Sequence, residues 1–186
     1  MRFLMAVSDI IDRVGAALNR VVRWLILLAI FVSAANALSR KLLQFSSNGF
    51  LEVQWYLFAA VFMLSAGYVF LKDDHVRVDV LSQHLSARTR AWIDLAGIVL
   101  FLFPFCVFLI WQSWPLVAGA WASGETSPNA GGLIRWPVYA LVPLGIGMLL
   151  LQSVSEMIKR AAFLSGHRAD PFSRVDVSGA VERSAR

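Results

Sequence analysis

The sequence predicts an all-α integral membrane protein with four transmembrane helices. Of its 186 residues, 58% are hydrophobic and only 16% are charged, and so few charges cannot cover the surface of a soluble domain. The formal charge of +5 is spread over the ends of apolar segments, which indicates contact with membrane lipids and not with nucleic acid. The four apolar segments predict spans of about the length that a bilayer requires, at residues 22–43, 51–71, 90–114 and 134–158.

Residues 1–20 show the period of an amphipathic helix. The apolar positions of this segment are Phe3, Leu4, Val7, Ile10, Ile11, Val14 and Leu18. Its other faces carry Ser8, Asp9, Asp12, Arg13 and Arg20. Two interpretations are open: a helix lying in the cytoplasmic membrane interface, or a plain extension of the first span.

The first span carries small and polar side chains on one side. Ala29, Ser33 and Ala37 recur every fourth residue, and such a stripe lets another helix pack closely. Asn36 and Arg40 fall near the same face, where an amide favours a protein partner over lipid. The equal alternative is that Arg40 simply reaches to the lipid headgroups.

Capping sequences precede the second and third spans. Ser47-Asn48-Gly49 is a turn that suits a helix cap, and Glu52 follows in the first turn, where a carboxylate complements the helix dipole. Ser86 begins a second capping sequence before the third span. Asp94, one turn inside that span, is the most buried carboxylate that the sequence predicts, and helix-dipole complementarity is enough to explain it.

Prolines and glycines shape the second half of the chain. Pro104 predicts a kink in the third span and Pro115 its end. Residues 115–135 are then expected to form a loop, because turn residues such as Gly131 and Gly132 gather there. Pro143 predicts a second kink, in the fourth span.

A polar run at residues 72–81 separates the second span from the third. Its valines alternate with Arg77 and Asp79 as in a strand, but the small chain offers no sheet edge for pairing. We favour a short interfacial helix that begins after Asp79. Metal binding by His75 with nearby aspartates is the less favoured alternative, because solvated loop side chains are far commoner.

The distribution of Lys and Arg predicts the orientation in the membrane. Of the 17 such residues, all but Arg40, Lys41 and Arg135 lie in the N-terminal segment, the 72–91 region or the region from Lys159 onward. This bias predicts that both termini are cytoplasmic. Residues 165–186 are polar and are expected to form a disordered cytoplasmic tail.

The residue pattern argues against autonomous transport and against catalysis. The middles of the four spans contain no ionisable side chain, whereas ion and proton pathways depend on such groups. No nucleophile has a recognisable base partner, so we expect no enzyme activity, catalytic residue, metal site or cofactor. A haem-holding membrane anchor is the rival class, but the three histidines lie outside the spans, where they cannot ligate a haem between helices.

Several short motifs, taken together, resemble the small membrane subunit of tripartite ATP-independent periplasmic (TRAP) transporters. These motifs are Asn36-x3-Arg40, Glu52, His75-Val76-Arg77-Val78-Asp79, Gly131-Gly132, and Trp136-Pro137-x-Tyr139-x3-Pro143-x-Gly145. The resemblance covers about residues 20–160. The sequence departs from the family pattern at Asp73-Asp74, where a glycine often precedes the histidine, and in having one acid instead of two at the start of the second helix.

The resemblance implies a non-catalytic subunit of a secondary transporter in the bacterial inner membrane. A periplasmic substrate-binding protein would deliver an organic anion, commonly a carboxylate, to a large membrane subunit that imports it with sodium. The small subunit would brace the scaffold of that large subunit. Its substrate and sodium sites would lie in the partner, and a membrane anchor of a respiratory or other complex is the alternative. Candidate partner-contacting or structural residues are Ala29, Ser33, Asn36, Arg40, Glu52, His75, Arg77, Asp79, Gly131, Gly132 and Pro143.

Overall fold

The computed structural model describes residues 2–44, 47–72, 85–129 and 131–166, and these are helical apart from connections and one isolated bridge between Thr126 and Ile134. The helices are α1 (Arg2–Leu42), α2 (Asn48–Lys72), α4 (Ala87–Gly97), the π-helix η1 (Ile98–Leu102), α5 (Phe103–Ser123) and α6 (Trp136–Leu164). Four helical stretches are long and apolar enough to cross a membrane, namely α1, α2, α4 through α5, and α6. The predicted all-α class and the four spans are therefore confirmed.

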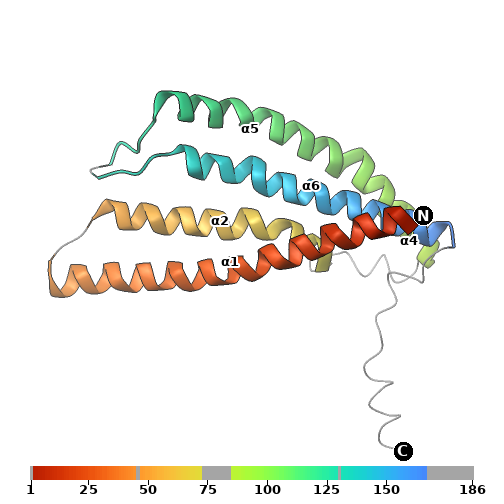
Figure 1. Ribbon diagram of the computed structural model, residues 1–186, viewed down its shortest axis with the longest axis horizontal. Helices are drawn as coiled ribbons and strands as arrows, with labels where there is room; N and C mark the ends of the chain where they lie inside the picture. The colour runs from red at the N-terminus through yellow and green to blue at the C-terminus, as the bar shows by residue number, and fades with distance from the viewer. Residues whose placement is uncertain (1, 45–46, 73–84, 130, 167–186) are drawn as a thin grey trace, which may run out of the picture.

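The long helices lie side by side in the order α1, α2, α6, α5 (Figure 1). α2 packs on both α1 and α6, and α5 packs on the other side of α6. α1 and α5 stand at opposite margins, so the molecule is an open layer and not a closed bundle. The α1–α2 and α5–α6 connections lie at one end, while the start of α1, α4 and the last turns of α6 meet at the other (Figure 1).

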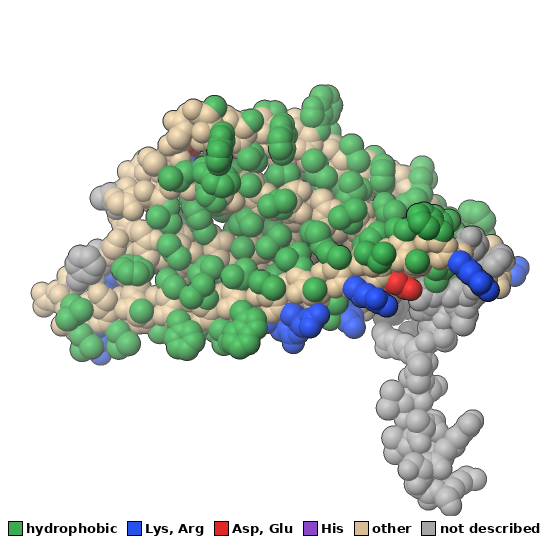
Figure 2. Space-filling model, viewed as in Figure 1, with side chains coloured by type: hydrophobic (Ala, Val, Ile, Leu, Met, Phe, Trp, Pro, Cys, Tyr) green, Lys and Arg blue, Asp and Glu red, His purple; other side chains and the backbone are tan. Residues whose placement is uncertain are grey.

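Small side chains fill the contacts between helices, and large apolar side chains point outward. The buried apolar residues are Val22, Ala29, Ala91, Ile98, Cys106, Ala120 and Ala162. Figure 2 shows hydrophobic side chains spread over the visible face, with Lys and Arg along the α1 edge. This distribution suits a lipid surrounding, because helices in a bilayer gain little from burying large apolar groups and associate through close packing.

The buried face of α1 repeats every seventh residue. Ser8, Gly15, Val22, Ala29 and Asn36 are its buried positions. A seven-residue repeat keeps one seam of a helix facing its neighbours along its whole length. This seam meets α6 in the N-terminal half of α1, and α2 packs along the rest of the helix.

Residues 2–20 form one continuous helix with the first span. Four of their seven apolar positions are exposed, with Phe3 at 78% and Ile10 at 59%, whereas Val7, Ile11 and Leu18 are half-buried. Ser8, which the sequence placed off the apolar face, is fully buried against α6. Ser8 can pack against protein because a hydroxyl is short enough for a close helix contact and finds a hydrogen-bond partner there, whereas Arg13 and Arg20 stay exposed.

Two glycines allow α2 and α6 to approach closely. A Cβ atom built on Gly145 of α6 would lie 2.5 Å from the carbonyl oxygen of Met63, and one built on Gly67 of α2 would lie 2.9 Å from that of Met148. Each glycine therefore lies against the backbone of the opposite helix. The two contacts are separated by about one turn, so the crossing of α2 and α6 is fixed at two levels.

The helix termini agree with the predicted caps, but one boundary was wrong. Ser86 caps α4 by accepting a hydrogen bond from the Thr89 backbone N–H at 3.2 Å, and α2 begins directly after Ser47. The loop expected from residue 115 is wrong, since α5 continues through Pro115 to Ser123 and ends at Gly124, whose φ is +62°. A proline removes one backbone hydrogen bond but does not end a helix whose other turns remain paired.

A π-turn stands where the sequence predicted a kink. In η1 the backbone N–H of Phe103 donates to the carbonyl of Ile98, five residues back, and Pro104 follows directly. Pro104 has no N–H to continue the ordinary α-helical ladder, so the widened turn is a local adjustment to it. Pro143 lies inside α6 and does not end that helix.

Two predicted segments, the interfacial helix after Asp79 and nearly all of the tail, lie outside the described residues. The candidate residues His75, Arg77 and Asp79 also lie outside the described residues.

Replacing Gly145 with alanine is expected to destabilise the α2–α6 contact by about 1–3 kcal/mol, because the added methyl group overlaps the Met63 backbone. Gly147→Ala is the matched control, since a Cβ atom there meets nothing within 4 Å. Thermal unfolding of both variants in the same detergent measures the difference. Equal melting temperatures for the two variants would contradict the close contact.

Candidate functional site: polar clusters at the two ends of α6

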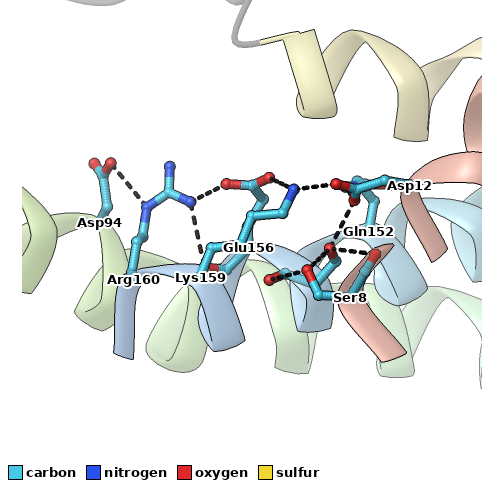
Figure 3. Close-up of polar contacts among 8 residues, drawn as sticks. Ser8, Asp12, Asp94, Gln152, Glu156, Lys159 and Arg160 are labelled. Carbon is cyan, nitrogen blue, oxygen red and sulfur yellow. Dashed lines mark hydrogen bonds and ion pairs between the residues drawn. The ribbon is translucent and has the colours of Figure 1, made fainter. Parts of the chain in front are cut away.

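Five charged side chains of alternating sign form a row at the end where α1, α4 and α6 meet (Figure 3). We call this row the ion chain, and its members in order are Asp12, Lys159, Glu156, Arg160 and Asp94. The Lys159 ammonium lies 2.6 Å from the Asp12 carboxylate and 2.7 Å from Glu156. The Arg160 guanidinium pairs with Glu156 and lies 3.1 Å from the Asp94 carboxylate. Glu156 is therefore shared by both cations.

Neutral polar groups extend the ion chain along the α1–α6 contact. The Ser155 hydroxyl donates to the Asp12 carboxylate at 2.7 Å, and the Gln152 amide donates to the same oxygen at 2.9 Å. The hydroxyls of Ser8 and Ser155 lie 2.7 Å apart. Gly15 faces this network, and a Cβ atom there would stand at an ordinary contact distance of 3.5 Å from the Gln152 amide oxygen.

The central charges of the ion chain are removed from solvent. The side chains of Arg160, Lys159 and Glu156 are 5%, 8% and 11% exposed, whereas the two end carboxylates keep 24%. Ions buried to this degree are tolerated only when they are paired and hydrogen-bonded, because their desolvation is costly. Each cation here lies between two carboxylates, so three separate helices are held to one another by charge pairing.

The helical period explains why α6 presents this set together. Positions three or four residues apart share one face of a helix. Ser155 and Glu156 follow Gln152 at this spacing, and Lys159 and Arg160 follow them in turn. Lys159 and Arg160 diverge to the two sides of Glu156, one toward α1 and the other toward α4 (Figure 3).

A second polar cluster holds the connection between α5 and α6 at the opposite end of the molecule. Glu52 of α2 accepts hydrogen bonds from the Leu133 backbone N–H at 2.7 Å, from the Asn129 amide at 2.8 Å and from the Ser127 hydroxyl. We call these four residues the Glu52 clamp. Gly132 is required in the same turn, because a Cβ atom there would lie 2.6 Å from Ser127.

An ion pair and a shallow pocket adjoin the Glu52 clamp. The Arg135 guanidinium lies 3.0 Å from the Glu125 carboxylate and 3.2 Å from the Tyr139 hydroxyl. The hydrogen bond with Glu125 raises the pKa of Arg135, which therefore stays charged. The pocket has a volume of about 380 Å³, opens widely, and is lined mainly by aromatic and polar side chains of α2 and α6 such as Trp55 and Tyr139.

The structure separates the candidate residues predicted from the sequence. Ala29, Asn36 and Glu52 are buried within the chain, whereas Arg40 and Gly131 are exposed. Ser33, Gly132 and Pro143 are half-buried, and Ser33 donates a hydrogen bond to the Ala29 carbonyl. Among the candidates that the structure describes, Glu52 and Gly132 come together in the turn that the clamp holds, in addition to the Ser33–Ala29 pair within α1.

The ion chain escaped prediction from the sequence. Asp94 was expected to be the most buried carboxylate, but Glu52 and Glu156 are more buried, and Asp94 is bound to Arg160. Lys159 and Arg160 had been counted only as charges that orient the chain in the membrane. The available signal was the spacing of Glu156 and Arg160, four residues apart and preceded by Gln152 on the same face.

Comparison with known proteins identifies the family. The family model described as "Tripartite ATP-independent periplasmic transporters, DctQ component" matches residues 29–163. The chain belongs to this family. No curated protein and no solved structure gives a significant match.

As a DctQ component, the chain is a multi-pass membrane subunit of a TRAP transporter, which confirms the family resemblance seen in the sequence. The matched region contains the Glu52 clamp and the α6 and α4 members of the ion chain. It begins at residue 29, so Asp12 and the N-terminal half of α1 lie outside it. The match does not favour the alternative of an anchor subunit in another membrane complex.

The chemistry that both clusters support is the joining of helices. Every charged member of the ion chain is paired with another member. Both carboxylate oxygens of Glu52 accept hydrogen bonds from the loop. Within the described ranges, no group of three or more His, Cys, Asp or Glu side chains is placed to hold a metal ion.

Replacing Lys159 with methionine is expected to destabilise the chain by about 3–5 kcal/mol, because the buried Glu156 and the half-buried Asp12 lose their shared cation. The measurement is thermal unfolding in detergent, with the exposed Arg23→Met as the control. The double variant D12N/K159M should lose less than the sum of the two single losses, since neither partner is then left unpaired. Strict additivity would show that the pair is not coupled.

Replacing Glu52 with glutamine is expected to loosen residues 125–135, because the new amide group places a donor against donors of the loop. Limited proteolysis should cut this loop faster than in the unchanged chain. Glu125→Gln is the control, since the partly exposed Glu125–Arg135 pair contributes at most about 1 kcal/mol. Cleavage that is faster in the control than in the Glu52 variant would refute the clamp.

Proposed function

We propose that this DctQ component braces the scaffold of the large membrane subunit of a TRAP transporter. In the complete transporter, a periplasmic substrate-binding protein delivers an organic anion, of the carboxylate class, and the large subunit imports it together with sodium. The small subunit performs no chemistry on the solute. Its task is to hold a fixed surface against which the moving part of the large subunit works.

The observation that carries this proposal is that α6 is fastened at both ends to the neighbouring elements. The ion chain joins its last turns to α1 and α4, and the Glu52 clamp joins the turn before it to α2. Between these ends, the Gly67 and Gly145 contacts hold α2 against α6. A layer fixed at three levels suits a part that must stay rigid while a partner moves.

The open arrangement of the helices supports a partner-dependent role. α1 and α5 stand at opposite margins with large apolar side chains exposed along them, among them Phe31 on α1 and Trp111 on α5. The charge-free middles of the spans offer no ionisable group to a solute or to sodium. The large subunit therefore has to supply the transport pathway, and this chain supplies surface.

The membrane placement forms part of the same proposal. Both termini lie in the cytoplasm, and the spans cross the bacterial inner membrane. The basic segment before Trp24 and the region after Lys159 then lie on the cytoplasmic side, as the distribution of Lys and Arg favours. Residues 1–20 lie at the cytoplasmic membrane surface. Residues 165–186, after the fourth span, form a cytoplasmic tail.

A tagged large membrane subunit, produced with this chain in the same cells, is expected to retain the chain through purification in mild detergent. The complex in liposomes, supplied with the binding protein, should take up solute when a sodium gradient is imposed. This chain alone in liposomes should show no uptake. Loss of the chain from the purified large subunit, or uptake by the chain alone, would refute the bracing role.

A further inference from the structure

We propose that the N-terminal half of α1 binds anionic phospholipid headgroups through a row of arginines. The arginine row consists of Arg2, Arg13 and Arg20. This proposal rests on the proposed position of residues 1–20 at the membrane surface and adds the chemical class of the lipid. It does not depend on the bracing role.

The seam of α1 sets the direction of the arginine row. Ser8 and Gly15 are buried against α6, and the contact of Asp12 with Lys159 fixes the rotation of the helix. Arg13 and Arg20 each follow a seam residue by five positions, which turns them about 140° away from the seam. Both are exposed, and neither forms an ion pair within the described part of the chain.

An apolar strip runs beside the arginine row on the same half of α1. Its members are Phe3, Ile10, Val14 and Val21, all at least 50% exposed. A basic face next to an apolar face is the arrangement of helices that lie at the boundary of headgroups and acyl chains. Asp9 is the acidic residue on the row, so the row keeps an excess of positive charge.

The length of α1 places the arginine row beyond the hydrocarbon. Its 41 residues extend about 62 Å, roughly twice the thickness of the hydrocarbon core. The charge-free part begins at Trp24, which is 71% exposed. An exposed tryptophan at such a boundary is typical of the membrane interface, so the arginine row begins at headgroup level with Arg20.

A lipid fits this surface better than a protein partner does. The guanidinium group binds phosphate through two parallel hydrogen bonds, and two residues seven apart can reach successive headgroups. The family match begins at residue 29, so the arginine row lies outside the matched region. The ion chain keeps the row from turning inward, because Asp12 stays bound to Lys159 of α6.

The test compares two variants that lose the same charge from opposite ends of α1. R13Q/R20Q removes two of the three arginines of the row, and R40Q/K41Q removes two basic residues near the other end. The delipidated full chain in detergent is titrated with dioleoylphosphatidylglycerol or with dioleoylphosphatidylcholine. Bound lipids are counted by mass spectrometry of the intact complexes, and the rise in melting temperature is recorded in parallel.

The unchanged chain and R40Q/K41Q are expected to retain phosphatidylglycerol in preference to phosphatidylcholine. R13Q/R20Q should bind phosphatidylglycerol about twentyfold more weakly, since each charge at an anionic surface changes affinity roughly fivefold. R13K/R20K keeps the charge and should keep most of the binding, which separates a charge effect from misfolding. Equal phosphatidylglycerol binding by R13Q/R20Q and R40Q/K41Q would overturn the proposal.

Two further results separate the possible failures. A fluorophore attached at Ile10→Cys in a Cys106→Ala background reports the membrane position of this half of α1 in nanodiscs. A blue-shifted emission without any phosphatidylglycerol preference would leave the surface position standing and overturn the lipid assignment. Loss of the large subunit from R13Q/R20Q, with phosphatidylglycerol binding unchanged, would identify the row as a protein contact and would also overturn it.

Discussion

The arrangement of this subunit depends on the shared carboxylate of Glu156. It stands between Lys159 and Arg160, and these two cations reach in opposite directions to Asp12 of α1 and Asp94 of α4. Buried ion pairs add little net stability compared with apolar packing, but they are costly to break one partner at a time. The ion chain therefore specifies which helices meet at this end more than it increases the stability of the layer.

The rest of the layer can remain weakly specified because its ends are held. α2 and α6 approach each other closely at two glycines. The other side chains buried between the helices are mostly small. Such packing fixes the distance between helices but gives little directional preference in lipid. The Glu52 clamp and the ion chain supply the direction, and a subunit fixed in this way suits the bracing role that we propose in the transporter.

The sequence predicted the elements well and their contacts poorly. The four spans, the Ser86 cap and the family followed from apolar length, capping chemistry and motif order. The helix end predicted at Pro115 was wrong, because the backbone hydrogen bond that a proline removes is only one of several in a long helix. The sequence did not identify the inward face of α1, because in lipid the apolar face of a helix can point outward as well as toward a neighbouring helix.

The sequence by itself determined that this chain is a four-span membrane protein of the TRAP family, because hydrocarbon requires long charge-free segments that can be counted directly. Only the tertiary structure decided which polar residues are partners. Asp12 and Lys159 are far apart in the chain, and no local pattern relates their positions until α1 crosses α6. The same crossing turned Ser8 inward and the arginines outward, since one helix rotation fixes every face at once.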